Sequence, residues 1–341
     1  MKYLMLSSVA IVVLNYNNPQ ATIECLDSLC HLDYPVFQPI VVDNGSADRS
    51  CDTIKDWCQN KSIRLVELNK QEAESRKAEP SAPVSKNTLI LIQSGANLGY
   101  AGGNNIGIRY ALERQFPYLW ILNNDTKVEP GALIALVAQA ESDPRIGLTG
   151  ATLVYENRPD QIQSAGGGWI TLWPPSSRHC LLPQEAAKPN GLSYVNGACI
   201  LAKAAAIQSI GLLDEQFFLY WEDADWSRRA RLAGWKIAAA PQARVRHKEG
   251  LSAGPSTPFS QYHHARSGVL YLKKHYPLLA PWLIFLLAGS KIINRLRRRQ
   301  FSILRPVIHG LMLKPFKPSS GAIQEEKMPA EQNSPAQRIV I

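Results

Sequence analysis

The fold is decided by a short stretch near the N-terminus, Val9-Ala10-Ile11-Val12-Val13-Leu14-Asn15-Tyr16-Asn17-Asn18-Pro19. Its first six residues are all apolar and mostly β-branched, which is typical of a parallel strand covered on both faces. The closing Asn-Pro pair then supplies a helix cap and a first helical residue, and an apolar stripe follows at Ile23, Leu26 and Cys30. The stretch therefore predicts the first strand, loop and helix of an α/β sheet.

The same alternation continues along the chain. Apolar runs predict strands over residues 39–42, 63–68, 89–93 and 118–122, and helical patterns start near residues 106 and 130. Strands that alternate with helices indicate α/β architecture, a doubly wound and mostly parallel sheet flanked by helices. The polar stretch 69–87 lacks apolar periodicity, so we expect a flexible insertion there. Residues 150–200 read as loops and short strands.

The charge distribution limits the possible partners. The chain has 341 residues, of which 45% are hydrophobic and 19% charged, and its net charge is +9. Residues 251–324 contain eleven Lys or Arg and no Asp or Glu, so this segment holds more than the whole net charge. A nucleic-acid binder should instead carry a positive stripe over its folded domain, so we expect no nucleic-acid partner.

The cysteines and the N-terminus bear on the compartment. The chain has six cysteines and no C-x-x-C pair, so the sequence indicates neither a zinc ribbon nor a redox dithiol. This use of cysteine favours a location in the reducing cytoplasm. The apolar N-terminus lacks a small-x-small cleavage site, so it reads as a buried strand and not as a signal peptide. We expect a cytoplasmic protein.

Three segments are expected. Residues 1–250 form the sheet domain, 251–318 a helical segment that is both basic and apolar, and 319–341 a disordered tail. The apolar run 278–288 is shorter than the ~20 residues that a spanning helix needs. It is either a core helix or a helix lying on an anionic membrane surface, and the basic residues after it favour the second. We therefore expect a peripheral protein on the inner face of the cell membrane. No pattern indicates an oligomeric state.

Two aspartates follow predicted strands. Asp43 and Asp125 lie at strand ends, where ligands bind in doubly wound sheets. A single aspartate at such a place is usually a turn former, but the pairing points to a ligand site. Asp125, preceded by Asn123 and Asn124, suits a hard cation, because Mg²⁺ takes only one or two protein carboxylates and completes its shell with phosphate and water.

A second cluster combines aromatic and acidic residues in Phe217-Phe218-Leu219-Tyr220-Trp221-Glu222-Asp223-Ala224-Asp225-Trp226. Apolar walls raise carboxylate pKa values and so make a better base near neutrality. Alternatively, Glu222 and Asp223 cap the helix expected over 223–234, and the two roles are compatible. His247 follows a strand expected over 236–240 and is either a structural residue or a ligand.

Five ordered motifs carry a resemblance. They are Val12-Val13-Leu14-Asn15-Tyr16-Asn17, Val41-Val42-Asp43-Asn44-Gly45-Ser46-Ala47-Asp48, Asn97-Leu98-Gly99-Tyr100-Ala101-Gly102-Gly103-Asn104-Asn105, Leu122-Asn123-Asn124-Asp125-Thr126, and Gly211-Leu212-Leu213-Asp214-Glu215 through Tyr220-Trp221-Glu222-Asp223-Ala224-Asp225 to His247. Over about residues 8–250 the chain closely resembles the inverting family 2 glycosyltransferases of the GT-A fold. The resemblance is strongest to the bacterial rhamnosyltransferase-like branch, which builds cell-surface polysaccharides.

The resemblance implies a role for each matched residue. It places the nucleotide-sugar donor against Tyr16, Asp43, Asp48, Asn97, Gly102, Gly103, Asn105 and Asn124. Tyr16 would lie against the nucleobase, Asp43 would bind the base or ribose, the glycines would let backbone approach the sugar, and Asn105 would steady their loop.

It also implies the catalytic groups. Asp125 and His247 would hold a divalent cation, Mg²⁺ or Mn²⁺, against the diphosphate, and Asp223 would be the catalytic base. Glu222 and Asp225 would bind acceptor hydroxyls or fix arginine side chains. One departure is that the family's Asp-x-Asp metal motif here reads Asn-Asn-Asp, so only Asp125 offers a carboxylate.

The implied reaction is the transfer of one sugar to a glycan or polyprenyl-linked acceptor, because the Gln-x-x-Arg-Trp motif of processive synthases is absent. The pattern favours dTDP-rhamnose over UDP-sugars as donor. Two alternatives are a sugar nucleotidyltransferase and a catalytically inactive carbohydrate-binding homologue. The first would need a basic Gly-rich loop near the N-terminus, and residues 14–20 contain no basic residue. The second is disfavoured by the intact Asp43, Asp125 and Asp223.

Overall fold

The computed structural model describes residues 6–75, 84–188, 191–248 and 257–315. The chain divides into two compact units, one of residues 1–170 with 179–255 and the other of residues 171–178 with 256–341. The division after residue 255 lies five residues beyond the boundary expected from the sequence. The expected tail 319–341 lies outside the described residues.

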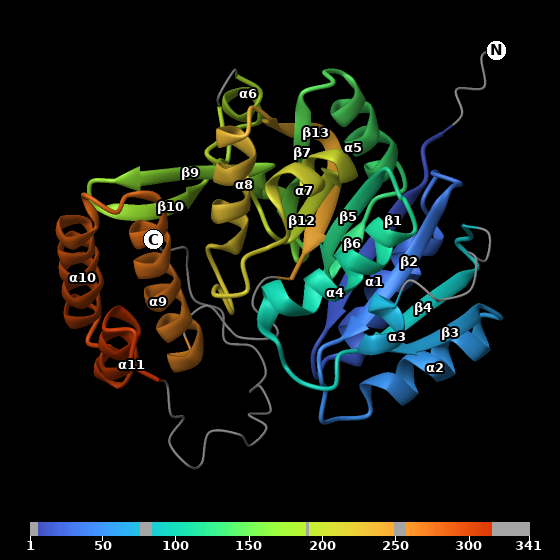
Figure 1. Cartoon of the computed structure of the whole chain (residues 1–341), viewed down its shortest axis with the longest axis horizontal. Helices are drawn as coiled ribbons and strands as arrows, with labels where there is room; N and C mark the ends of the chain where they lie inside the picture. The colour runs from blue at the N-terminus through green and yellow to red at the C-terminus, as the bar shows by residue number, and fades with distance from the viewer. Residues whose placement is uncertain (1–5, 76–83, 189–190, 249–256, 316–341) are drawn as a thin grey trace. The chain divides into compact units, whose positions relative to one another are not determined.

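The first unit contains a large, largely parallel sheet, which confirms the expected fold class (Figure 1). The strand order is β3-β4-β2-β1-β5-β12-β7-β13-β6, with β8 paired to β7. The strands are β1 (Val9–Asn15), β2 (Phe37–Asp43), β3 (Arg64–Asn69), β4 (Thr88–Gln93), β5 (Tyr118–Asn123), β6 (Thr126–Val128), β7 (Ile146–Tyr155), β8 (Arg158–Ala165), β12 (Cys199–Lys203) and β13 (Lys236–His247). The first five strands of this order are mutually parallel, whereas β12 runs antiparallel to β5 and β7. A small sheet holds β9 (Gly167–Leu172), β10 (Pro175–His179) and β11 (Tyr194–Val195).

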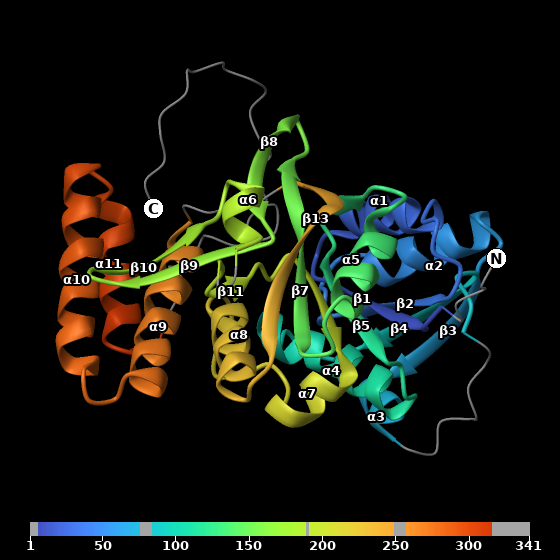
Figure 2. The ribbon, with the colours of Figure 1, turned by 90° about the horizontal axis from the view of Figure 1, so that it is seen from above.

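Helices cover both faces of the sheet, as the alternating sequence pattern requires. They are α1 (Pro19–Cys30), α2 (Ser50–Asn60), α3 (Lys70–Glu74), α4 (Gly99–Glu113), α5 (Ala132–Glu141), α6 (Pro183–Ala186), α7 (Ala204–Ile210) and α8 (Glu222–Leu232). Figure 2 shows α1 and α2 on one side of the strands and α3 and α4 on the other. Leu26, Ile54 and Leu133 belong to one buried cluster, and Ile106 and Trp226 belong to the other.

The start of the chain folds as its sequence predicts. The six apolar residues of β1 pair in register with β2 on one side and β5 on the other. Asn18 caps α1 by accepting a hydrogen bond from the Ala21 amide at 3.3 Å, and Pro19 is the first helical residue.

Three expectations are corrected. Residues 70–74 of the expected insertion form α3, which begins in a capping box between Asn69 and Glu72 and buries Ala73 completely in the core. Residues 76–83 lie outside the described residues. Strand β13 extends to His247, beyond the expected 236–240, because the chain resumes pairing with β7 after an irregularity between Ala240 and Arg244. Strand β7 is also a full ten residues long, not short.

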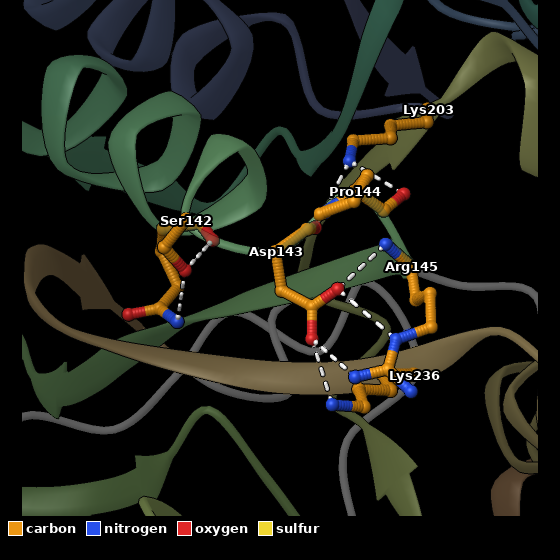
Figure 3. A network of polar contacts seen from close by, with 7 residues as sticks. Ser142, Asp143, Pro144, Arg145, Lys203 and Lys236 are labelled. Atoms are coloured by element: carbon orange, nitrogen blue, oxygen red, sulfur yellow. Dashed lines mark hydrogen bonds and ion pairs between the residues drawn. The ribbon is translucent and has the colours of Figure 1, made fainter.

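An ion-pair network lies where β7 and β13 begin (Figure 3). Asp143 accepts hydrogen bonds from Arg145 at 3.1 Å and from Lys236 at 2.7 Å, and Lys203 donates to the Pro144 carbonyl at 3.2 Å. The neighbouring Arg145 and Lys236 hold the pKa of the Asp143 carboxyl well below its usual range. The network fixes the turn before β7 to β12 and β13.

The second unit contains three helices in its described part, α9 (Pro258–His275), α10 (Ala280–Arg297) and α11 (Phe301–Leu311). Thr257 caps α9 by accepting from the Ser260 amide at 3.1 Å. Ala265, Ile303 and Val307 form a buried cluster between α9 and α11. Within the described ranges, no helix is both long and apolar enough to cross a membrane.

Candidate functional site

The site begins at the edge of the sheet where β1, β2 and β5 end. Asn15 pairs with Asp43, and Leu14 pairs with Asn123, so the three strands finish side by side. The polar residues after these strands therefore share one edge, as the sequence predicts for parallel strands. Tyr16 lies in the loop after β1 and is half-buried.

Asp43 is buried and shapes the loop after β2. Its Oδ1 accepts hydrogen bonds from Asn15 Nδ2 at 2.7 Å and Ser46 Oγ at 2.6 Å, and its Oδ2 accepts from the Ser46 amide at 3.1 Å. Asp48 is exposed and accepts from the amide of Ser50, the first residue of α2, at 3.0 Å. Both predicted donor residues thus also stabilise local structure.

Asn44 joins this loop to the start of α4. Its Nδ2 donates to Asn97 Oδ1 and to the Gly99 carbonyl, both at 3.1 Å, and its Oδ1 accepts from the Leu98 amide at 3.0 Å. Asn97 itself is exposed. Sequence reasoning named Asn44 only as part of a motif. Its position directly after Asp43 could have indicated a structural role. A buried side-chain amide at the end of a strand can form hydrogen bonds with several backbone groups at once.

Gly99 fixes the other side of the same loop. Its φ of +73° favours glycine, and a Cβ at this position would lie 2.3 Å from the Phe218 carbonyl oxygen. The neighbouring Tyr100 amide donates to that oxygen at 2.7 Å. The start of α4 is therefore held against the segment that precedes α8, which brings the third and fifth sequence motifs together.

Gly102 and Gly103 lie inside α4 and face protein atoms. A Cβ on Gly103 would be 2.5 Å from Leu14 Cδ1, and one on Gly102 would be 2.8 Å from Leu98 Cβ. The helix begins at Gly99, so both glycines fall in its first turns and allow it to pack closely. The geometry gives them a packing role, and the expected approach of their backbone to the sugar stays a prediction.

Two predicted donor residues make contacts within the protein. Asn105 is buried, with Nδ2 donating to the Leu213 carbonyl and to Glu215 Oε1, both at 2.9 Å. It therefore steadies the segment around residue 213, not its own loop as expected. Asn124 Nδ2 donates to Thr22 Oγ1 at 3.0 Å and so faces α1.

Asp125 and His247 lie together. His247 Nε2 is 3.2 Å from Asp125 Oδ1, because β13 pairs with β6 and sets His247 opposite Thr126. His247 Nδ1 lies 2.7 Å from Gln163 Oε1 on β8. An amide oxygen accepts, so in the neutral ring Nδ1 carries the proton and Nε2 presents its lone pair toward Asp125. Sequence reasoning missed Gln163, which is 84 residues from His247.

This pair fits a divalent cation that arrives with a diphosphate. A carboxylate and an imidazole are both ligands for divalent ions such as Mn²⁺, and phosphate and water can complete the shell. Within the described residues, no group of three or more His, Cys, Asp or Glu side chains is placed to hold a metal ion. The described residues alone therefore offer a carboxylate and an imidazole, and the Asn-Asn-Asp sequence predicts only one carboxylate.

Asp223 lies in the first turn of α8, beside the loop 196–198. Its Oδ2 accepts from the Gly197 amide at 3.0 Å and its Oδ1 from the Ala224 amide at 2.7 Å. Burial raises the pKa of Asp223 to about 6, against the lowering effect of these two amides. Tyr220 and Trp221, just before it, have φ values of +67° and +70°. Such backbone is strained in non-glycine residues and typical of functional sites.

Glu222 is buried next to Asp223 and differs from it. Burial, followed by the neighbouring Asp223 charge, raises the pKa of Glu222 well above its usual range. Its Oε2 has no hydrogen-bond partner within the described part of the chain. Two adjacent carboxyls thus differ: burial favours the protonated form of both, and more strongly for Glu222 than for Asp223.

The loop 196–198 connects the two acidic centres. Tyr100 donates its hydroxyl hydrogen to the Gly197 carbonyl at 2.5 Å, while the Gly197 amide binds Asp223. Burial, followed by the nearby Glu222 and Asp223 carboxyls, raises the pKa of Tyr100, so its hydroxyl remains a donor. The Asn123 amide donates to the Ala198 carbonyl at 3.0 Å. The loop that carries Asp125 and the helix that carries Asp223 therefore contact the same short segment.

Asp225 has a structural contact. It is completely buried and pairs with Arg229 at 2.8 Å. Arg229 also donates to the Ile210 and Leu212 carbonyls, at 2.6 and 2.8 Å. The resemblance implies that Asp225 binds acceptor hydroxyls or fixes an arginine side chain. In the structure Asp225 holds the side chain of Arg229.

Comparison with known proteins bears on the family and the fold of the chain. The family model described as Glycosyl transferase family 2 matches residues 10–208. The N-acetylglucosaminyl-diphospho-decaprenol L-rhamnosyltransferase of Mycobacterium tuberculosis (strain CDC 1551 / Oshkosh) is 28% identical over 207 residues, which are 54% of this chain and 67% of that protein. The low-salt glycan biosynthesis hexosyltransferase Agl10 of Haloferax volcanii is 25% identical over 301 residues, covering 88% of this chain and 82% of that protein.

A solved structure supports the fold. The mannosyltransferase PcManGT from Pyrobaculum calidifontis aligns with a TM-score of 0.57 at 13% identity, over 90% of this chain and 87% of that one. Together these findings confirm the fold and the rhamnosyltransferase-like resemblance deduced from the motifs, and they do not support the nucleotidyltransferase alternative. Because the family model covers more than half of its length, the chain belongs to glycosyl transferase family 2.

Proposed function

We propose that this protein is an inverting, metal-dependent glycosyltransferase that adds one rhamnose from dTDP-rhamnose to a glycan or polyprenyl-linked acceptor in cell-surface polysaccharide synthesis. The observation that carries the proposal is that a candidate base and a candidate cation site are both anchored to the loop 196–198. Asp223 accepts a hydrogen bond from this loop, and Asn123, two residues before Asp125, donates one to it. Asp223 is a carboxylate with a raised pKa, and Asp125 with His247 forms a partial cation site. The similarity to a rhamnosyltransferase named for a decaprenol-linked substrate supports the sugar and the acceptor class.

Asp223 is proposed as the base of a single displacement. The acceptor oxygen bonds to the anomeric carbon, the bond from that carbon to the diphosphate oxygen breaks, and the hydroxyl proton passes to Asp223. A pKa of about 6 leaves Asp223 ionised at neutral pH, yet makes it more basic than an ordinary carboxylate. The Gly197 and Ala224 amides orient its two oxygens.

Asp125 and His247 are proposed to hold the cation, Mg²⁺ or Mn²⁺. When bound, the cation supplies positive charge that stabilises the leaving diphosphate. Gln163 holds the His247 ring so that Nε2 faces the site. The related fold of PcManGT was solved with GDP-mannose and Mn²⁺, which supports a divalent ion here.

The nucleoside end of the donor is proposed to lie at the loops after β1 and β2. Tyr16 is half-buried there and offers a ring for a base to lie against. Asp43 Oδ2 accepts a hydrogen bond from the Ser46 amide, and a carboxylate oxygen has the capacity to accept another from a base N–H or a ribose hydroxyl. Asp48 is exposed in the loop after β2, and Asn97 is exposed in the loop between β4 and α4. Glu222, in its protonated form, is proposed to donate to an acceptor oxygen.

A polyprenyl-linked acceptor lies in a membrane, whereas nucleotide sugars are soluble. We therefore also propose that the protein works as a peripheral protein on the cytoplasmic face, at an anionic membrane surface.

Nucleoside diphosphate release tests the reaction. The full chain is incubated with Mn²⁺, a polyprenyl-diphosphate-linked sugar and, in turn, dTDP-rhamnose and UDP-sugars. We expect acceptor-dependent release from dTDP-rhamnose. Equal release without acceptor, or release only from UDP-sugars, would contradict the proposed transfer or the proposed donor respectively.

A further inference from the structure

Helix α10 and the turn before it expose large apolar side chains along one face, in two groups separated by Gly289. The members of this stripe are Leu278 (95% exposed), Trp282 (52%), Phe285 (66%), Ile293 (49%) and Leu296 (46%). Successive members are four, three, eight and three residues apart. At about 100° per residue, all five project within an arc of about 80°. The stripe runs for roughly 27 Å, from residue 278 to 296 at about 1.5 Å per residue.

The opposite face of α10 is already used. Ala280, Leu283 and Leu287 are buried within the protein. The exposed stripe is therefore additional to what α10 needs for folding. The Trp282 and Phe285 rings stack with centroids 5.6 Å apart and an interplanar angle of 22°, which makes a flat aromatic surface at one end. Large exposed side chains in such a row mark an interaction surface, and tryptophan favours membrane interfaces.

The charges around the stripe identify the partner. Exposed Lys273 and Lys274 precede it at the end of α9, and exposed Arg297, Arg298 and Arg299 follow it at the end of α10. No Asp or Glu occurs between residues 251 and 324. A second copy of this chain would bring like charges together at both ends of the stripe, which opposes association. Anionic lipid headgroups would neutralise these cations while the acyl region covers the apolar side chains.

We propose that the α10 stripe, defined by these five apolar residues, docks in the plane of a bilayer that contains anionic lipids. Because the stripe extends along the whole helix, the axis lies parallel to the membrane and the helix does not cross it. This inference rests on the proposed function in one respect only: the proposed function explains why membrane docking would be useful, since it would bring the enzyme to a lipid-linked acceptor. Binding itself can be measured without turnover.

Vesicle sedimentation tests the proposal. The full chain is mixed at low salt with phosphatidylcholine vesicles, with or without phosphatidylglycerol. We expect binding to the anionic vesicles, its release at high salt, and at least a tenfold loss of affinity in the double variant Trp282→Glu/Phe285→Glu. Ile134→Glu on α5 is the matched control, because Ile134 is a 44% exposed apolar residue outside the stripe, and it should bind as the wild type does.

The outcomes are distinguishable. Unchanged vesicle binding in the double variant, or equal binding to neutral vesicles, would overturn the proposal. So would a wild-type dimer that becomes a monomer in the double variant without any vesicle binding, since the stripe would then join two copies. Circular dichroism establishes that each variant is folded. Brominated lipids should quench wild-type fluorescence more than that of Trp282→Phe. If vesicles bind but no nucleoside diphosphate is released, the transferase proposal fails and this inference stands.

Discussion

Replacing Asp223 by Asn separates catalysis from stability. The amide keeps the shape of the side chain but cannot accept the acceptor proton, so we expect turnover to fall by a factor of about 10² to 10⁴. Donor binding should be retained, because the proposed donor contacts lie with Asp43 and Asp125 on other loops. Asp143→Asn is the matched control, since Asp143 belongs to the ion-pair network at the start of β7, and its turnover should be unchanged.

The stability of this variant follows from two opposing effects. A carboxyl pKa raised from 3.8 to about 6 makes ionised Asp223 cost about 2 to 3 kcal/mol at neutral pH, a cost that Asn removes. Asn also replaces one acceptor oxygen by an NH₂ group, so one of the Gly197 and Ala224 amides loses its partner, at about 1 to 3 kcal/mol. The free energy of unfolding at pH 7.5 should therefore change only within a range from a loss of about 1 kcal/mol to a gain of about 2 kcal/mol.

The pH dependence gives a sharper check. The folded state binds the Asp223 proton more tightly than the unfolded state, so the wild type gains stability relative to Asp223→Asn as the pH falls through about 6. Between pH 7.5 and pH 5 the gain should be about 1.4 kcal/mol, measured by urea unfolding of both proteins. Wild-type turnover should decline over the same range, because a protonated Asp223 is not a base. Turnover near the wild-type level in Asp223→Asn would reject this residue as the base and direct the test to Glu222.

Other substitutions test the rest of the site. Asp125→Ala should abolish metal-dependent donor binding, measured by calorimetry, and His247→Ala should weaken this binding less. If the wild type keeps full activity in EDTA, neither residue has the proposed role of holding a cation. Gln163→Leu should weaken Mn²⁺-dependent donor binding about 10- to 100-fold with little effect on binding measured without metal, and an equal loss in both conditions would show a merely structural role. Gly99→Ala should lower the free energy of unfolding by more than about 1 kcal/mol, because its Cβ would meet the Phe218 carbonyl at a φ that opposes alanine; a neutral effect would show that the loop relaxes.

The sheet and its acidic edge could be predicted from the sequence, and the reason is geometric. Parallel strands end at one edge, so Asp43 and Asp125 had to lie at the same edge of the sheet once their strands were recognised, although β1 separates the two strands. Residues within α4 could not be assigned in this way. A motif places Gly103 and Asn105 near the site, but only the packed helix determines that they face Leu14 and Leu213.

Contacts between distant strands escaped prediction for a related reason. The irregularity in β13 near Pro241 hid its continuation, so His247 looked like a loop residue and its partner Gln163 on β8 carried no signal. Helix α3 has only five residues, which is too short for an apolar period, and its single buried Ala73 is invisible in a polar stretch. The α10 stripe could be seen only once the buried side of the helix was known.

The configuration of the transferred sugar tests the central claim most directly, namely that Asp223 acts as the base in a single displacement opposite the Asp125 and His247 pair. The product formed from dTDP-rhamnose and a polyprenyl-linked acceptor is isolated, and the one-bond carbon–hydrogen coupling at its anomeric centre is measured by NMR. The account predicts the anomeric configuration opposite to that of the donor, formed by the wild type and not by Asp223→Asn. A product that retains the donor's configuration would contradict it.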